Sequence, residues 1–102
     1  MPLKLVRVSL SAEAQADANA VIDWYIGEGA FIAAEDFTKE IDSALNLLNQ
    51  FAALGESAAH NTRSLPLRDF PYSLIYRLQD DTVRVIAIAH HSRRPGYWIN
   101  RR

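Results

Sequence analysis

The spacing of apolar residues predicts a strand followed by a helix at the start of the chain. Residues 4–9 alternate in part and are rich in β-branched side chains, which is typical of a short strand. Ser9 or Ser11 can cap the helix that follows, and Gly27 and Gly29 end it. Apolar side chains recur at helical spacing between these signals and form one face: Ala14, Ala18, Val21, Ile22 and Tyr25.

A second helix is predicted over residues 32–54, with Gly55 just past its end, where a left-handed cap is common. The link between the two helices is short, so they should form an antiparallel hairpin. The apolar stripe of the second helix consists of Ala34, Phe37, Ile41, Ala44, Leu45, Leu48 and Phe51.

The second half of the chain has the pattern of strands. Residues 56–62 are small and polar, and we expect a loop there. Residues 63–68 form a strand in which Pro66 implies an edge position or a bulge. The two strongest strand patterns, over residues 72–78 and 82–90, should pair as a hairpin.

The predicted order of elements is therefore β-α-α-β-β-β. One run of helices followed by one run of strands favours an α+β fold, in which an antiparallel sheet is covered on one face by the helical hairpin. A length of 102 residues fits a single domain over residues 1–102. Apolar residues make up 49% of the chain and charged residues 23%, which is ordinary globular composition and argues against disorder.

The composition excludes several classes of function. Without cysteine there is no disulfide scaffold, thiolate metal site or cysteine nucleophile. The three histidines lack the spacing of metal ligands, and no glycine-rich phosphate loop is present, so we expect no metal and no cofactor. Lys4 and Arg7 interrupt the N-terminal segment too early for a secretory signal, and no stretch approaches the roughly 20 apolar residues of a membrane helix. We expect a cytoplasmic protein with no membrane partner.

A net charge of −1 hides a division between the two halves of the chain. Residues 1–56 hold three basic residues against nine acids, a balance of −6. Residues 57–102 hold eight arginines against three acids, a balance of +5. Such asymmetry indicates a basic working surface for nucleic acid or an acidic protein, or an arginine-edged sheet beside acidic helices.

The basic charge is densest in the last thirteen residues, 90–102, which hold four arginines, two histidines and two aromatic residues. Guanidinium groups match phosphates and carboxylates, and flat rings can stack on a partner. Pro95 and Gly96 can also turn the chain so that Trp98 folds back onto the core and Tyr97 faces outward. The tail is where we look for function first.

Five pieces of the second half follow one another in a specific order and spacing: Arg63–Leu67, Phe70–Arg77, Val85–His90, Arg93–Trp98 and Arg101. Together these motifs resemble the ParE/RelE superfamily of toxins from bacterial type II toxin–antitoxin modules. The resemblance covers nearly the whole chain and is strongest to the ParE branch, which includes plasmid stabilisation proteins.

The resemblance implies one of two activities. ParE-type toxins inhibit DNA gyrase by binding it and trapping it on cleaved DNA, without being enzymes. RelE-type toxins cleave mRNA on the ribosome. An inactive homologue that only binds its antitoxin is a third alternative. All three imply a cognate antitoxin of the ParD or RelB type and a toxin–antitoxin hetero-oligomer.

The chemistry of RNA cleavage favours the ParE alternative. A ribonuclease needs a cation on the developing phosphorane charge and groups that move protons. RelE-like enzymes have an arginine immediately after the tyrosine of the middle strand, where this chain has Ser73. If the chain were nonetheless a ribonuclease, His91, Arg93 and Tyr97 would carry the reaction. Adjacent strand positions point to opposite faces, so His90 and His91 should not share a site.

For a gyrase-binding toxin, the residues expected to contact the target lie in the tail. They are Arg93, Arg94, Tyr97, Trp98 and Arg101. Arginines would attract the target, and aromatic rings would anchor the complex. We expect no sequence-specific binding of nucleic acid.

Charge and amphipathicity suggest where the antitoxin binds. An acidic helix would suit the basic sheet half, where Arg63 and Arg77 lie, and another helix could cross the helical hairpin. Trp24 and Phe31 fall beside the apolar stripes, so we include them as antitoxin contacts. For Phe31 we expect burial first, because a helix junction commonly buries one aromatic residue.

Overall fold

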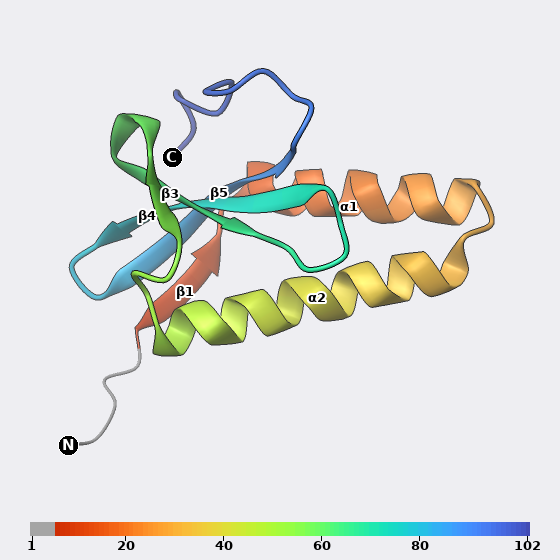
Figure 1. Ribbon diagram of the computed structural model, residues 1–102, viewed down its shortest axis with the longest axis horizontal. Helices are drawn as coiled ribbons and strands as arrows, with labels where there is room; N and C mark the ends of the chain where they lie inside the picture. The colour runs from red at the N-terminus through yellow and green to blue at the C-terminus, as the bar shows by residue number, and fades with distance from the viewer. Residues whose placement is uncertain (1–5) are drawn as a thin grey trace.

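A computed structural model describes residues 6–102, and in it two helices cover one face of a five-stranded sheet (Figure 1). The elements follow the predicted order, with one further strand and one short 3-10 helix. They are β1 (Arg7–Leu10), α1 (Ala12–Gly27), α2 (Phe31–Gln50), β2 (Glu56–Ala58), η1 (Ala59–Asn61), β3 (Thr62–Pro66), β4 (Tyr72–Gln79) and β5 (Thr82–His90). The predicted α+β class is confirmed. Part of the predicted first strand, residues 4 and 5, lies outside the described residues.

The loop expected over residues 56–62 is wrong, because β2 and η1 occupy it. β2 pairs antiparallel with β3, with Glu56 opposite Ser64 and Ala58 opposite Thr62. His60 and Asn61 turn the chain between them in left-handed conformations, each with φ 59°. The three small or polar residues of β2 have too little hydrophobic pattern to indicate a strand. The strand is defined only by its pairing with β3.

The sheet is mixed, not wholly antiparallel as expected. Its strand order is β1-β5-β4-β3-β2. β1 runs parallel to β5, with Arg7 opposite Thr82 and Leu10 opposite Val85. The remaining pairs are antiparallel, including the predicted hairpin of β4 and β5. Alternation along one strand says which face is buried, but it does not say in which direction the neighbouring strand runs.

The edge position predicted for Pro66 is confirmed. β2 pairs only with residues 62–64 of β3, so Pro66 lies beyond it and pairs with Ser73 of β4 alone. Because no strand accepts a hydrogen bond there, the missing N–H of proline costs nothing.

The main core lies between the helices and the sheet. Ser11 caps α1 by accepting a hydrogen bond from the Ala14 N–H at 3.0 Å, as one of the two expected caps. Most of both predicted apolar stripes are buried or packed against this core; Phe51, at 50% exposed, is not. The stripe ends early because α2 ends at Gln50.

Gly55 is required for a close approach, and not as the left-handed cap that we expected. Among the glycines, only Gly29 and Gly96 have positive φ. A Cβ on Gly55 would lie 2.8 Å from the Tyr76 ring. The Gly55 N–H donates to the Tyr76 hydroxyl at 2.9 Å, and that hydroxyl donates to the Ala52 carbonyl at 2.8 Å. These bonds fix the link from α2 to the sheet.

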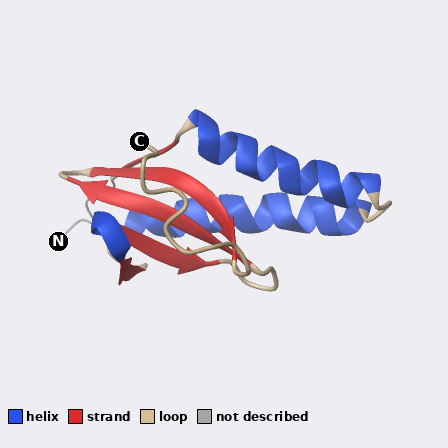
Figure 2. Cartoon of the chain, turned by 90° about the horizontal axis from the view of Figure 1, so that it is seen from above, coloured by secondary structure: helices blue, strands red, loops and turns tan. Residues whose placement is uncertain are grey.

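Two features of the overall shape position the candidate site. The helical hairpin extends past the end of the sheet (Figures 1 and 2). The C-terminal tail crosses the sheet on the face opposite the helices (Figure 2). Within residues 6–102 no helix is both long enough and apolar enough to cross a membrane.

Candidate functional site

Trp98 anchors the tail on the outer face of the sheet. Its ring is 8% exposed and belongs to a second apolar cluster with Ile75, Ile86, Ala87 and Ala89. Among residues 6–102, the indole Nε1 finds no hydrogen-bond partner. Of the two readings of this residue, burial selects the one in which it closes the core, so in this conformation the ring offers no surface to a target.

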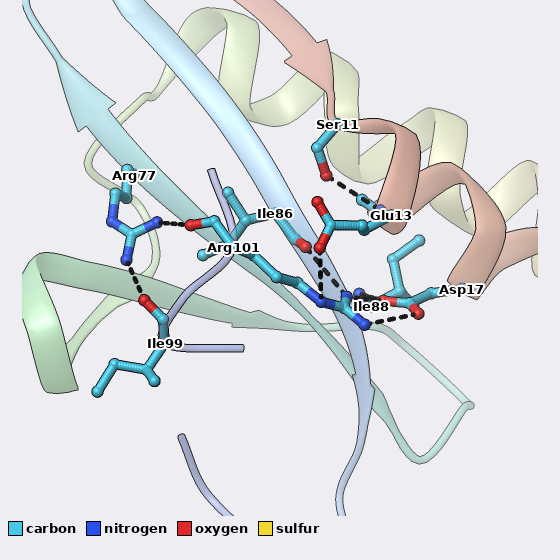
Figure 3. A network of polar contacts seen from close by, with 9 residues as sticks. Ser11, Glu13, Asp17, Arg77, Ile86, Ile88, Ile99 and Arg101 are labelled. Carbon is cyan, nitrogen blue, oxygen red and sulfur yellow. Dashed lines mark hydrogen bonds and ion pairs between the residues drawn. The ribbon is translucent and has the colours of Figure 1, made fainter. Parts of the chain in front are cut away.

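Arg101 is held by α1 and by the edge of β5 (Figure 3). Its guanidinium contacts Asp17 Oδ2 at 2.6 Å and donates to the Ile86 carbonyl at 3.2 Å. The same Asp17 oxygen accepts from the Ile88 N–H at 3.0 Å. Because β1 ends opposite Val85, Ile86 and Ile88 of β5 have no strand neighbour on that side. The side chains of Arg101 and Asp17 bind their main-chain groups in place of a strand. The bond to Asp17 raises the pKa of Arg101.

Two further arginines hold parts of the chain in place. Arg77 donates to the Arg101 carbonyl at 2.8 Å and weakly to the Ile99 carbonyl at 3.5 Å (Figure 3). Arg63 donates to the Gly55 carbonyl at 2.8 Å. Both are half-buried and bind main-chain oxygens, which gives each a structural role independent of any antitoxin.

In the predicted target-binding set, Arg93 is exposed and packs on Tyr97, which is half-buried. The Arg93 guanidinium lies 3.9 Å from the centre of the Tyr97 ring, a cation–π contact. Arg94 beside them is exposed. Burial raises the pKa of the Tyr97 phenol, so it stays protonated at neutral pH and can donate a proton but is a poor base.

Ser73 and His91 form a pair that the sequence did not reveal. Ser73 Oγ lies 2.9 Å from His91 Nε2, and the serine is buried. They are 18 positions apart, and the strand partner of Ser73 is Ala89, so no spacing rule identifies the contact. His90 instead contacts the Tyr72 ring. The expectation that the two histidines point to opposite faces is confirmed.

The three residues of the ribonuclease alternative take part in separate contacts. His91 binds Ser73 and the Pro71 carbonyl, whereas Arg93 packs on Tyr97. Among residues 6–102, no hydrogen bond or ring contact joins His91 to that pair. In the same part of the chain, no three histidine or acidic side chains lie close enough to hold a metal ion.

A groove of about 240 Å³ joins the predicted target and antitoxin residues. Trp24 of α1 lines it together with Arg93 and Tyr97 of the tail. Tyr72 and His90 also contribute. One partner in this groove would therefore contact residues of both predicted sets.

The tip of the helical hairpin is an exposed apolar surface. Trp24 is 60% and Phe31 65% exposed, and Ile26 and Ile32 are exposed beside them. The expected burial of Phe31 is wrong, because the hairpin extends beyond the sheet and no other element of the described chain covers its tip (Figure 2).

Comparison with known proteins identifies the family. Residues 8–95 match the family described as the ParE toxin of the type II toxin–antitoxin system, parDE. Among solved structures, the chain is similar to a chain of the chromosomal ParDE toxin–antitoxin system from P. aeruginosa, with a TM-score of 0.74 and 22% identity. That match covers 85% of this chain and 97% of the other. No curated protein matches.

Proposed function

This chain belongs to the ParE toxin family of type II toxin–antitoxin systems, and we propose that it inhibits DNA gyrase by binding and trapping it. The observation that carries the proposal is the cation–π pair of exposed Arg93 and half-buried Tyr97, with exposed Arg94 beside it. A cation already packed on an aromatic ring loses little side-chain freedom on binding, which favours a surface anchor.

The proposed mechanism is association, not catalysis. Arg93 and Arg94 would accelerate the encounter with an acidic target surface, and the Tyr97 ring would provide apolar contact. Ser73 supports this mechanism over RNA cleavage, because it supplies no fixed positive charge and its hydroxyl is bound to His91.

We further propose that a ParD-like antitoxin neutralises the toxin in the cytoplasm by occupying the groove of Trp24 and Tyr97. The exposed apolar tip of the hairpin would take another part of the antitoxin. Because Arg93 also lines the groove, the antitoxin would cover part of the proposed gyrase-binding surface.

Pulse labelling after induction in a bacterial host tests the function. We expect DNA synthesis to fall before RNA and protein synthesis. Changing Arg93 and Arg94 together to Ala should remove this effect, whereas Arg68→Ala, an exposed arginine beside α2, should retain it. Antitoxin binding should survive the double change, since the hairpin tip remains.

Tyr97→Phe separates the two active alternatives. A gyrase-binding surface needs the ring and should tolerate loss of the hydroxyl, whereas RNA cleavage needs the phenol as a proton donor. If protein synthesis falls first and Tyr97→Phe abolishes it, the chain is an mRNA endonuclease. If strong expression affects no synthesis, it is an inactive antitoxin-binding homologue.

A further inference from the structure

The outer face of the sheet holds a second basic site, away from Arg93. A cavity of about 500 Å³ lies near the start of β5, whereas Arg93 follows the end of that strand. Its polar lining consists of Arg77, Gln79, Arg84, Asn100, Arg101 and Arg102, and two isoleucines complete it. In the part of the chain that the structure describes, residues 6–102, no acidic side chain and no aromatic ring lines it.

Two of these arginines oppose each other directly. Arg77 of β4 and Arg84 of β5 are partners in the antiparallel register. Side chains at such positions leave the sheet about 5 Å apart, and like charges placed there repel each other. This repulsion destabilises the sheet, and an anion bound by both guanidinium groups would remove it.

The bonds that orient these two arginines do not neutralise them. Arg77 donates to main-chain carbonyls of the tail. Arg84 donates to Ser9 Oγ at 3.2 Å and to the Leu10 carbonyl at 3.3 Å. Within residues 6–102, neither forms an ion pair with a carboxylate. Arg101 differs, because Asp17 and Glu13 balance its charge.

We propose that this cavity binds a phosphate of a nucleic-acid backbone. Guanidinium groups match phosphate oxygens, and each has five N–H donors, of which the neutral acceptors use only some. Without an aromatic ring the cavity cannot stack a base, so binding is independent of sequence. The Gln79 and Asn100 amides are available to the sugar or to the phosphate.

The position of the cavity favours a polyanion over an acidic peptide. It lies on the face of the sheet, where the main-chain groups of β4 and β5 already pair, so a peptide cannot add there as a strand. Arg7 is exposed on β1, two residues before Ser9, which is the register partner of Arg84. Alternate residues share a face, so Arg7 extends the positive charge beyond the cavity.

The test uses the purified full chain and a duplex of arbitrary sequence of about 20 base pairs, over about 50 to 200 mM salt. We expect binding to weaken with salt. Arg84→Gln should weaken it by roughly fivefold and make the slope of log K against log salt shallower by about one. Arg84→Lys, which restores the charge, should restore the slope. The control Arg68→Gln should match the unchanged protein, and thermal unfolding checks that all variants are folded.

Equal effects of Arg84→Gln and Arg68→Gln would overturn the site, because binding would then reflect diffuse surface charge. If inorganic phosphate shifted the Arg84 side-chain NMR signals but the duplex did not bind, the nucleic-acid backbone would be excluded as the ligand. If Arg84→Gln weakened the binding of a glutamate-rich peptide but left duplex binding unchanged, the ligand would be an acidic protein and the proposal would be overturned. Gyrase is absent from the assay, so the result is independent of the proposed target.

Discussion

Arginine has two roles in the second half of this chain. Arg63, Arg77 and Arg101 bind main-chain carbonyls or carboxylates and hold the tail and the link after α2. Arg93 and Arg94 remain exposed. Residue type alone predicts a basic surface but does not distinguish the two roles, because the partners lie up to 84 positions away along the chain.

Loss of the Asp17 carboxylate should destabilise the fold. Asp17→Ala leaves the Arg101 guanidinium and the Ile88 N–H without this partner in a half-buried site. We expect the free energy of unfolding to fall by about 3 kcal/mol, measured by urea denaturation. Glu35→Ala, which removes an exposed ion pair with Lys39, is the matched control and should leave the midpoint unchanged. Equal effects would refute the edge-pairing role of Asp17.

Stability should fall at alkaline pH through the tyrosines. Burial raises the pKa of Tyr72, Tyr76 and Tyr97 above the ordinary value. Above about pH 10 the unfolded chain loses these protons before the folded chain does, so the free energy of unfolding decreases as pH rises. Urea midpoints between about pH 9 and 11 should decline, and less steeply in Tyr97→Phe. An identical decline in that variant would contradict the assigned shift.

At the scale of elements, periodicity carried most of the prediction. The helices, β4 and β5 have long repeating patterns, whereas β2 has three residues and was missed. The parallel pairing of β1 was also missed, because it depends on where the hairpin returns the chain. Strand β5 contains an irregularity between Val85 and Ala87 that places Ile86 on the outer face, and no residue type marks it.

The tail is an element whose stability depends on Trp98. Trp98→Ala should lower the free energy of unfolding by about 3 to 5 kcal/mol, because it leaves a large cavity over the sheet. Trp98→Phe should change it by less than about 1 kcal/mol, because the smaller ring also removes the unpaired indole N–H. Thermal and urea unfolding measure both. A loss in Trp98→Phe as large as in Trp98→Ala would contradict this account of how Trp98 anchors the tail.

At the scale of the whole molecule, the helices and the tail divide the two faces of one sheet (Figure 2). The groove between α1 and the tail joins residues that the sequence assigned to separate partners, so under the proposed function an antitoxin bound there would exclude the target. Sequence patterns placed the basic residues in the second half of the chain, but only the fold places Trp24 and Tyr97 in one groove.

The most direct test of gyrase trapping is the amount of cleaved plasmid that purified gyrase accumulates with ATP and this protein, after detergent and protease treatment. We expect linear DNA to accumulate with the unchanged protein and with Arg68→Ala. Changing Arg93 and Arg94 together to Ala should raise the concentration needed by at least about tenfold. Undiminished supercoiling with no cleaved DNA, at concentrations where the protein arrests growth, would contradict gyrase as the target.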